Sequence, residues 1–64
     1  MGLWELHGIG YVDPHVVGDA ASIDVTAEGT SIIGAWEQDQ LLAVMEALVV
    51  TGFDLLSARR LDAT

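Results

Sequence analysis

The chain has 64 residues and a mass of 6.8 kDa, so residues 1–64 are expected to form one small domain with a single core. Ten acidic and two basic side chains give a formal charge of −8 at pH 7, and 52% of the residues are hydrophobic. That hydrophobic fraction is too high for a disordered segment. The sequence contains no cysteine, which excludes a disulfide framework and a thiolate metal site.

The longest apolar run, Leu41–Val50, is interrupted by Glu46 and has about half the length that a bilayer span requires. Met1–His7 lacks the basic stretch and the apolar core of a secretion signal. We therefore expect a soluble domain in the cytoplasm that does not contact a membrane.

The two basic residues, Arg59 and Arg60, are adjacent, and there is no lysine. A protein that binds nucleic acid or anionic lipid normally neutralises phosphates with several Lys and Arg side chains, so we expect neither as a direct partner. The excess of carboxylates keeps an apolar small protein in solution, or it presents a negative surface to a basic partner, as a nucleic-acid mimic does. The scattered positions of the acidic residues favour the first interpretation.

The N-terminal segment Leu3–Val12 starts with alternating apolar and polar residues, which is typical of a half-buried strand. The alternation changes phase at Gly8, where we expect either a bulge or a close approach of another backbone. The close approach without a bulge is slightly favoured. In that case Ile9 and Tyr11 lie on the outer face of the sheet.

A short helix and a hairpin are predicted next. Asp13–Pro14 is typical of a helix start, with Asp as the N-cap and Pro as the first helical residue. His15–Ala21 then supplies about two turns of helix, or an irregular turn in its place. Ser22–Ala27 is a predicted strand, Glu28–Gly29 is typical of a two-residue hairpin turn, and Thr30–Trp36 is the partner strand.

The longest predicted element is a helix over Gln38–Thr51, followed by a strand over Phe53–Leu61. Asp39 is expected to cap the start of the helix, and Gly52 is expected to end it. The residues expected on its core side are Leu41 or Leu42, Met45, Leu48 and Val49.

The order of these elements predicts an α+β fold: a small antiparallel sheet of about four strands with one main helix. A ferredoxin-like β-α-β-β-α-β order fits the chain best. If the first helix is absent, the order is β-β-β-α-β.

The outer side of the long helix is apolar as well, although a helix that faces water carries polar residues there. A chain of this length buries only about 60% of the surface that its unfolded form exposes, so it cannot surround a helix alone. We therefore predict association with a second copy or with a partner protein. The predicted interface consists of Val44, Ala47 and Val50, extended by Trp36, Ile9 and Tyr11. The alternative is that the helix residues are small aliphatic side chains exposed to solvent.

His7, Asp13 and His15 have side chains suited to a divalent metal or to general-base catalysis. Their spacing matches no helical ligand motif, and positions on a surface strand and in a first helical turn account for the two histidines more simply. Helix capping likewise explains Glu37 and Asp39 better than acid–base chemistry does. We therefore predict no catalytic residue, no metal site and no cofactor.

The two arginines point to opposite faces of the last predicted strand. One of Arg59 and Arg60 is expected to pair with Asp54 or Asp62. The other is able to hold a carboxylate of a partner through two hydrogen bonds. Together with His7, the arginines are the predicted polar contacts.

Residues 30–61 resemble a group of small, largely uncharacterised bacterial proteins. In that group a strand ending in Gly leads to an Asp-Gln pair, a helix, a Gly-terminated turn and a Leu-rich strand. The residues that carry the resemblance are Thr30, Ile32, Gly34, Asp39, Gln40, Leu42, Met45, Gly52, Phe53, Leu55, Leu56 and Ser57. The opening Trp4–Leu6 is similar to the aromatic-acidic-aliphatic start of those proteins.

The chain departs from that group in two ways. The spacing from Gly34 to Asp39 is one residue longer, and helix positions that are polar in the group are aliphatic here. The resemblance implies a compact sheet with one main helix, and it transfers no catalytic residue.

The favoured hypothesis is a small acidic, non-enzymatic interaction module that acts as a homo-oligomer or as an accessory subunit of a larger assembly. One alternative is an acidic inhibitor or nucleic-acid mimic that binds a basic site on an enzyme. The other is a small dimeric enzyme or ligand-binding protein with its pocket between sheet and helix. Only His7, Tyr11 or Arg59 is placed to supply a polar group to such a pocket.

Overall fold

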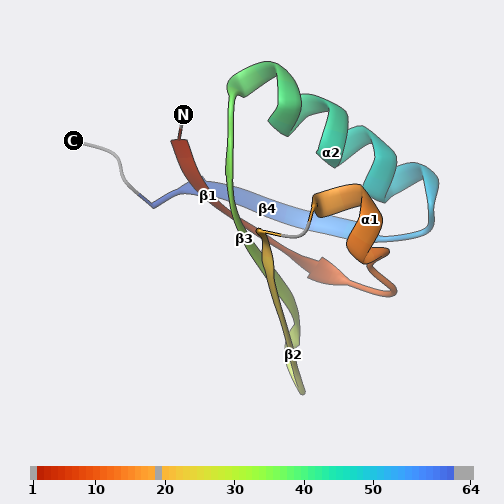
Figure 1. Ribbon diagram of the computed structural model, residues 1–64. Coiled ribbons are helices and arrows are strands. Elements are labelled where there is room, and N and C mark those ends of the chain that lie inside the picture. The colour runs from red at the N-terminus through yellow and green to blue at the C-terminus, as the bar shows by residue number, and fades with distance from the viewer. Residues whose placement is uncertain (1, 19, 62–64) are drawn as a thin grey trace.

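Six elements follow one another in the order β-α-β-β-α-β in the computed structural model, which describes residues 2–18 and 20–61. They are β1 (Gly2–Ile9), α1 (Pro14–Val17), β2 (Ser22–Thr26), β3 (Gly29–Trp36), α2 (Gln38–Val50) and β4 (Asp54–Arg60). The four strands form one sheet, and both helices lie on the same face of it (Figure 1). The predicted α+β fold with a four-stranded antiparallel sheet is therefore confirmed.

The strands are arranged in the order β2-β3-β1-β4, and every neighbouring pair is antiparallel. β1 and β3 are central, so β2 and β4 form the two edges of the sheet. The hairpin between β2 and β3 turns at Ala27 and Glu28, one residue earlier than predicted. Gly29 instead begins β3, where it pairs with Thr26 and has a φ of 140°.

One face of β1 supplies the centre of the core. Leu6 pairs with Ile32 of β3, and both side chains are fully buried beneath the helices. Gly8 lies on the same face, where a Cβ atom would overlap the carbonyl oxygen of Asp54 and the ring of Phe53. The expected close backbone approach at Gly8 is therefore confirmed.

The bulge near this position lies in β4 and not in β1. His7 pairs with Ser57, whereas the next residue, Gly8, pairs with Leu55, so β4 carries one extra residue. The pairing of β1 with β3 continues past this point without a shift. β1 ends at Ile9, earlier than predicted.

The helix α1 begins as predicted but is shorter. Asp13 is its N-cap, and the Asp13 carboxylate accepts a hydrogen bond of 2.9 Å from the backbone N–H of His15. Pro14 is the first helical residue. The helix ends after four residues, because Gly18 follows with a φ of 93°. The prediction of about two turns was therefore wrong.

The helix α2 ends as predicted but has a different N-cap. The cap is Glu37 and not Asp39: the backbone N–H of Glu37 donates to the side-chain oxygen of Gln40 at 3.0 Å, as in a capping box. At the other end Gly52 has a φ of 101°, and the N–H of Phe53 donates to the carbonyl of Leu48 at 2.9 Å. This hydrogen bond and the positive φ of Gly52 form the glycine C-cap that the sequence predicts.

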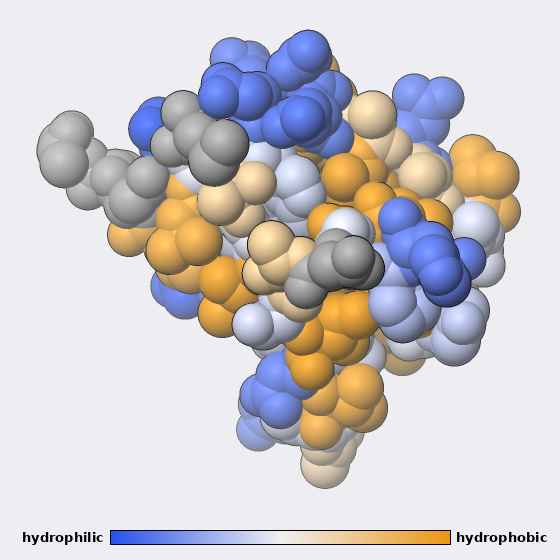
Figure 2. All heavy atoms as spheres, viewed as in Figure 1, coloured by the Kyte–Doolittle hydropathy of each residue, from blue (hydrophilic) through white to orange (hydrophobic). Residues whose placement is uncertain are grey.

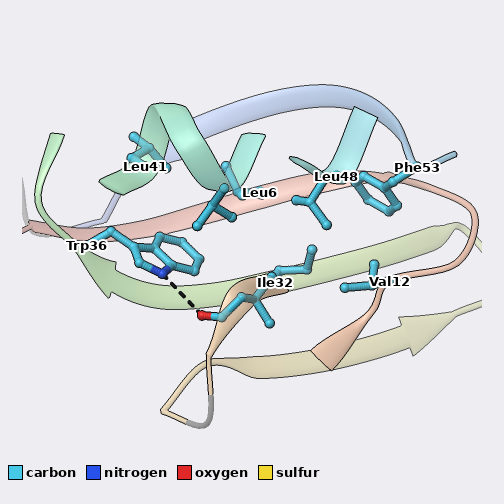
Figure 3. Close-up of a cluster of buried hydrophobic side chains, with 9 residues drawn as sticks. Leu6, Val12, Ile32, Trp36, Leu41, Leu48 and Phe53 are labelled. Atoms are coloured by element: carbon cyan, nitrogen blue, oxygen red, sulfur yellow. Dashed lines mark hydrogen bonds between the residues drawn. The ribbon is translucent and has the colours of Figure 1, made fainter. Parts of the chain in front are cut away.

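The core lies between the sheet and the helices, and Figure 3 shows several of its side chains meeting there. Its buried apolar members are Leu6, Val12, Val17, Ile32, Trp36, Leu41, Val44, Leu48 and Phe53. The buried side of α2 thus contains Leu41, Val44 and Leu48. Leu41, one of the two alternatives, and Leu48 are buried as predicted. Val49, also expected on that side, is 56% exposed, and Val44, expected on the outer side, is buried, so the helix is rotated relative to the prediction.

Candidate functional site

The predicted interface residues of α2 do not share one surface. Val44 is only 9% exposed and belongs to the core, Ala47 is half-buried, and Val50 is 78% exposed. The assignment of Val44 to the outer face is wrong: Val44 belongs to the same buried cluster as Val17 of α1, and α1 contacts α2.

The aromatic and aliphatic residues predicted to extend the interface also separate. Trp36 is 7% exposed, and its indole N–H donates to the carbonyl oxygen of Val17 at 3.2 Å (Figure 3). Its predicted role as an exposed anchor is therefore wrong, since the ring joins β3 to the end of α1. Ile9 and Tyr11 are 54% and 69% exposed, as expected.

The large apolar side chains that α2 exposes are those of Leu42, Val49 and Val50, and we call the pair Leu42 and Val49 the outer helix face. An α-helix has about 3.6 residues per turn, so Leu42 and Val49 lie two turns apart on one flank. Val50 points farther from the sheet. The sequence signal for this face was the spacing of Leu42 and Val49, but an all-round apolar helix gave no polar side to orient it.

The strand β4 exposes most of its length at an edge of the sheet. All of its residues except Leu55 are exposed, and Leu56 is 56% exposed. Leu61 donates its N–H to the carbonyl of Leu3 at 2.8 Å, on the β1 side of the chain. Because backbone groups alternate sides along a strand, Ala58 and Arg60 direct theirs away from β1.

The arginines lie on the two faces of β4, as predicted. Arg59 pairs with Glu5 of β1 at 2.8 Å, and its side chain is 69% exposed. One of the two arginines was expected to pair with Asp54 or Asp62, and the ion pair that Arg59 makes is with Glu5 of the neighbouring strand. Arg60 lies opposite Trp4, and both residues line a surface pocket of about 180 Å³. The alternative partner Asp62 lies outside the described residues.

A second exposed apolar region lies on the hairpin. Ile23 and Val25 of β2 are 36% and 74% exposed. Figure 2 shows apolar side chains running from the helices down to this hairpin, with hydrophilic residues gathered at the start of α2. A surface pocket of about 290 Å³ lies beside the hairpin, lined by Ile9, Gly10 and residues 25–30.

The predicted metal or general-base residues remain in separate surroundings. Asp13 Oδ1 lies 3.1 Å from Nδ1 of His15. The hydrogen bond from the backbone N–H of His15 and, to a smaller extent, the one from its ring lower the pKa of Asp13. His7 lies half-buried on the uncovered face of the sheet, between Ser31 and Ser57 on the neighbouring strands. Across residues 2–18 and 20–61, no three His, Asp or Glu side chains gather in a way that would hold a metal ion.

The interior has no polar site within the part of the chain that the structure describes. Thr30 is the one buried polar residue there, and no buried side-chain nitrogen or oxygen lacks a hydrogen-bond partner. Neither surface pocket is lined by His7, Tyr11 or Arg59. The described residues thus offer exposed surfaces for contact with another molecule.

Comparison of the chain with protein-family models, with curated proteins and with solved structures found no match in any of the three. Within the described ranges, the helices are too short or too polar to span a bilayer.

Proposed function

We propose that this chain is a small acidic protein–protein interaction module without enzymatic activity, acting as a homo-oligomer or as an accessory subunit of a larger assembly. The observation that carries the proposal is the outer helix face. Leu42 and Val49 are 60% and 56% exposed on one flank of a helix whose only charged residues are Asp39 and Glu46. This face takes over the role that the sequence assigned to Val44 and Ala47.

The energetic reason is the small size of the core. Only Leu6, Ile32 and Leu48 are fully buried large side chains in the described residues. A domain of this size derives no more than a few kcal/mol of stability from its own core. Covering one exposed Leu or Val contributes about 1.5–3 kcal/mol before entropy losses, so two or three such contacts are comparable to the stability of the whole domain.

We infer that the chain is a reduced ferredoxin-like fold, in which α1 has shrunk to one turn. Two interleaved β-α-β units, β1-α1-β2 and β3-α2-β4, support the inference. In the strand order β2-β3-β1-β4, β3 lies between the two strands of the first unit, and β1 lies between the two strands of the second. A cytoplasmic location stays a prediction from the sequence.

Size-exclusion chromatography with light scattering, over a range of concentrations, tests the main proposal. We expect a mass of at least two chains that persists at about 1 M salt, because apolar contacts are not screened by ions. A mass of 6.8 kDa at every concentration would exclude the homo-oligomer.

The accessory-subunit form is tested with the double variant Leu42→Glu, Val49→Glu. Both positions are more than half exposed, so the variant is expected to keep the circular dichroism spectrum of the wild type. It should lose the protein that co-purifies with the wild-type chain from its native cells. Equal retention of that protein by both chains would exclude the outer helix face.

The alternative of an acidic inhibitor is supported by exposed carboxylates on three elements and the hairpin turn. These are Asp24, Glu28, Asp39, Glu46 and Asp54. An inhibitor that acts through these groups would lose affinity for a basic enzyme steeply as salt rises. A salt-stable complex would therefore reject this alternative.

A further inference from the structure

The outer edge of β4 is suited to pairing with another strand. β4 has seven residues and β2 has five, so β4 is the longer edge of the sheet. It contains neither proline nor lysine, which are common means of preventing edge pairing. The backbone groups of Ala58 face outward along this edge and can template a further strand.

The charges on β4 favour an antiparallel copy of the same strand as the partner. Asp54 is at one end, and the only two Lys or Arg residues of the chain are at the other. If two β4 strands meet about a two-fold axis at Ser57, each Asp54 lies alongside the arginines of the other copy. Asp54 and Arg59 also share a face of the sheet, because their partners Ile9 and Glu5 are four residues apart in β1.

The other edge lacks this complementarity. Asp24 is the only charged residue of β2 and lies at its centre. An antiparallel pair of β2 strands centred there would place Asp24 opposite its own copy, which is destabilising. The charges therefore select β4 over β2.

The exposed flank of α2 would be covered by the same pairing. A two-fold axis perpendicular to the sheet leaves both α2 helices on one face, above the new strand pair, and α2 contacts β4. Val44 shares the buried core with Val17 of α1, and Ala47 lies on the same flank of α2 by helical spacing. Leu42 and Val49 lie on the opposite flank, which faces the β4 edge in a right-handed β3-α2-β4 connection. Val50 points away from the sheet and stays outside the contact.

We propose that the partner of this module is a second copy of the chain, joined β4 to β4 in antiparallel register about a two-fold axis at Ser57. The two four-stranded sheets then form one continuous sheet of eight strands, with the Leu42–Val49 flanks of the two helices facing each other. This inference rests on the proposed function, and it specifies the partner and the geometry of the contact.

A cysteine at the two-fold axis tests the register. Ser57 would lie opposite itself in a non-hydrogen-bonded pair, with Cα atoms about 4.5 Å apart, which is within the range for a disulfide. The chain has no cysteine, so Ser57→Cys introduces the only thiol. The matched control is Ala27→Cys, an exposed position at the hairpin turn.

Under mild oxidation at about 10 μM protein, Ser57→Cys should form a disulfide-linked dimer about 100-fold faster than Ala27→Cys. The reason is that thiols held together experience an effective concentration of about 1 mM or more. Equal rates for the two variants would overturn the register at Ser57. If the wild type nevertheless forms oligomers in solution, the proposed function stands and only this inference fails.

Two neighbouring valines test the helix contact. Val49→Glu and Val50→Glu make the same substitution at adjacent exposed positions, 56% and 78% exposed, at the same end of α2. Val49→Glu should raise the dimer Kd about 100-fold, since a change costing about tenfold acts twice in a two-fold symmetric interface. Val50→Glu should leave the Kd unchanged. Equal effects of the two substitutions would overturn the proposed orientation of the helices.

Discussion

The rotation of α2 can be tested by making one substitution at two positions of the same helix. Val44 is 9% exposed and Val50 is 78% exposed. In both cases Val→Ala improves helix propensity by about 0.5 kcal/mol, so this term cancels when the two variants are compared. What remains is the difference in burial.

The magnitude follows from the carbons removed. Val→Ala deletes two methylene equivalents, and each is worth about 0.8 kcal/mol when buried. A residual cavity beneath α2 adds to this at Val44, so Val44→Ala should be about 2 kcal/mol less stable than Val50→Ala. For a domain of this size, that difference corresponds to melting temperatures about 8–16 °C apart.

Urea unfolding followed by circular dichroism, at a concentration where the chain is monomeric, measures the two free energies of unfolding. Thermal scans of the same samples give the melting temperatures. Val50→Ala should match the wild type or exceed it slightly. Equal losses of unfolding free energy at the two positions would refute the rotation of α2. A larger loss at Val50 would mean that Val50 is the more buried of the two residues.

Three further predictions follow from single contacts. Trp36→Phe removes the indole donor to the carbonyl of Val17 and should lower the free energy of unfolding by about 1–3 kcal/mol in urea titrations. Gly8→Ala should abolish a cooperative melting transition because its Cβ meets backbone and ring atoms, whereas Gly52→Ala, strained only by its φ of 101°, should cost about 1–3 kcal/mol. The lowered pKa of Asp13 means that its cap is complete above the ordinary value of 3.8 and is lost as pH falls through the lower folded-state pKa. An NMR titration of the capped amide should show this loss in the wild type and not in Asp13→Asn.

The order of the elements could be predicted because local signals mark their ends. Asp13 with the following proline fixes the start of α1, and Gly52 fixes the end of α2. Alternating residues identify β2 and most of β1. These signals depend on residues that are close together in the sequence, so they do not depend on the tertiary contacts of the fold.

The rotation of α2 and the position of Trp36 could not be predicted in the same way. The helix is apolar on nearly every side, so its periodicity does not identify the side that faces the sheet. That choice depends on α1, whose Val17 packs into the core and accepts the hydrogen bond of Trp36. A four-residue helix that covers one flank of α2 decides which valines are buried, and this is a tertiary contact with no local signature.

The charge of the chain limits how two copies can approach. Each carries −8, so a dimer would carry 2 × (−8) = −16, and most orientations bring like charges together. At physiological salt this repulsion is screened beyond about 8 Å, so its strength depends on the charged groups nearest to the contact. The two arginines are both on β4, and the exposed pair of Arg59 with Glu5 contributes no more than about 1 kcal/mol to the fold itself. Their placement therefore matters more for approach than for folding: the β4 edges can meet, while Asp24 and Glu28 at the β2 edge repel a further copy. The sheet is thereby expected to stop growing at two chains.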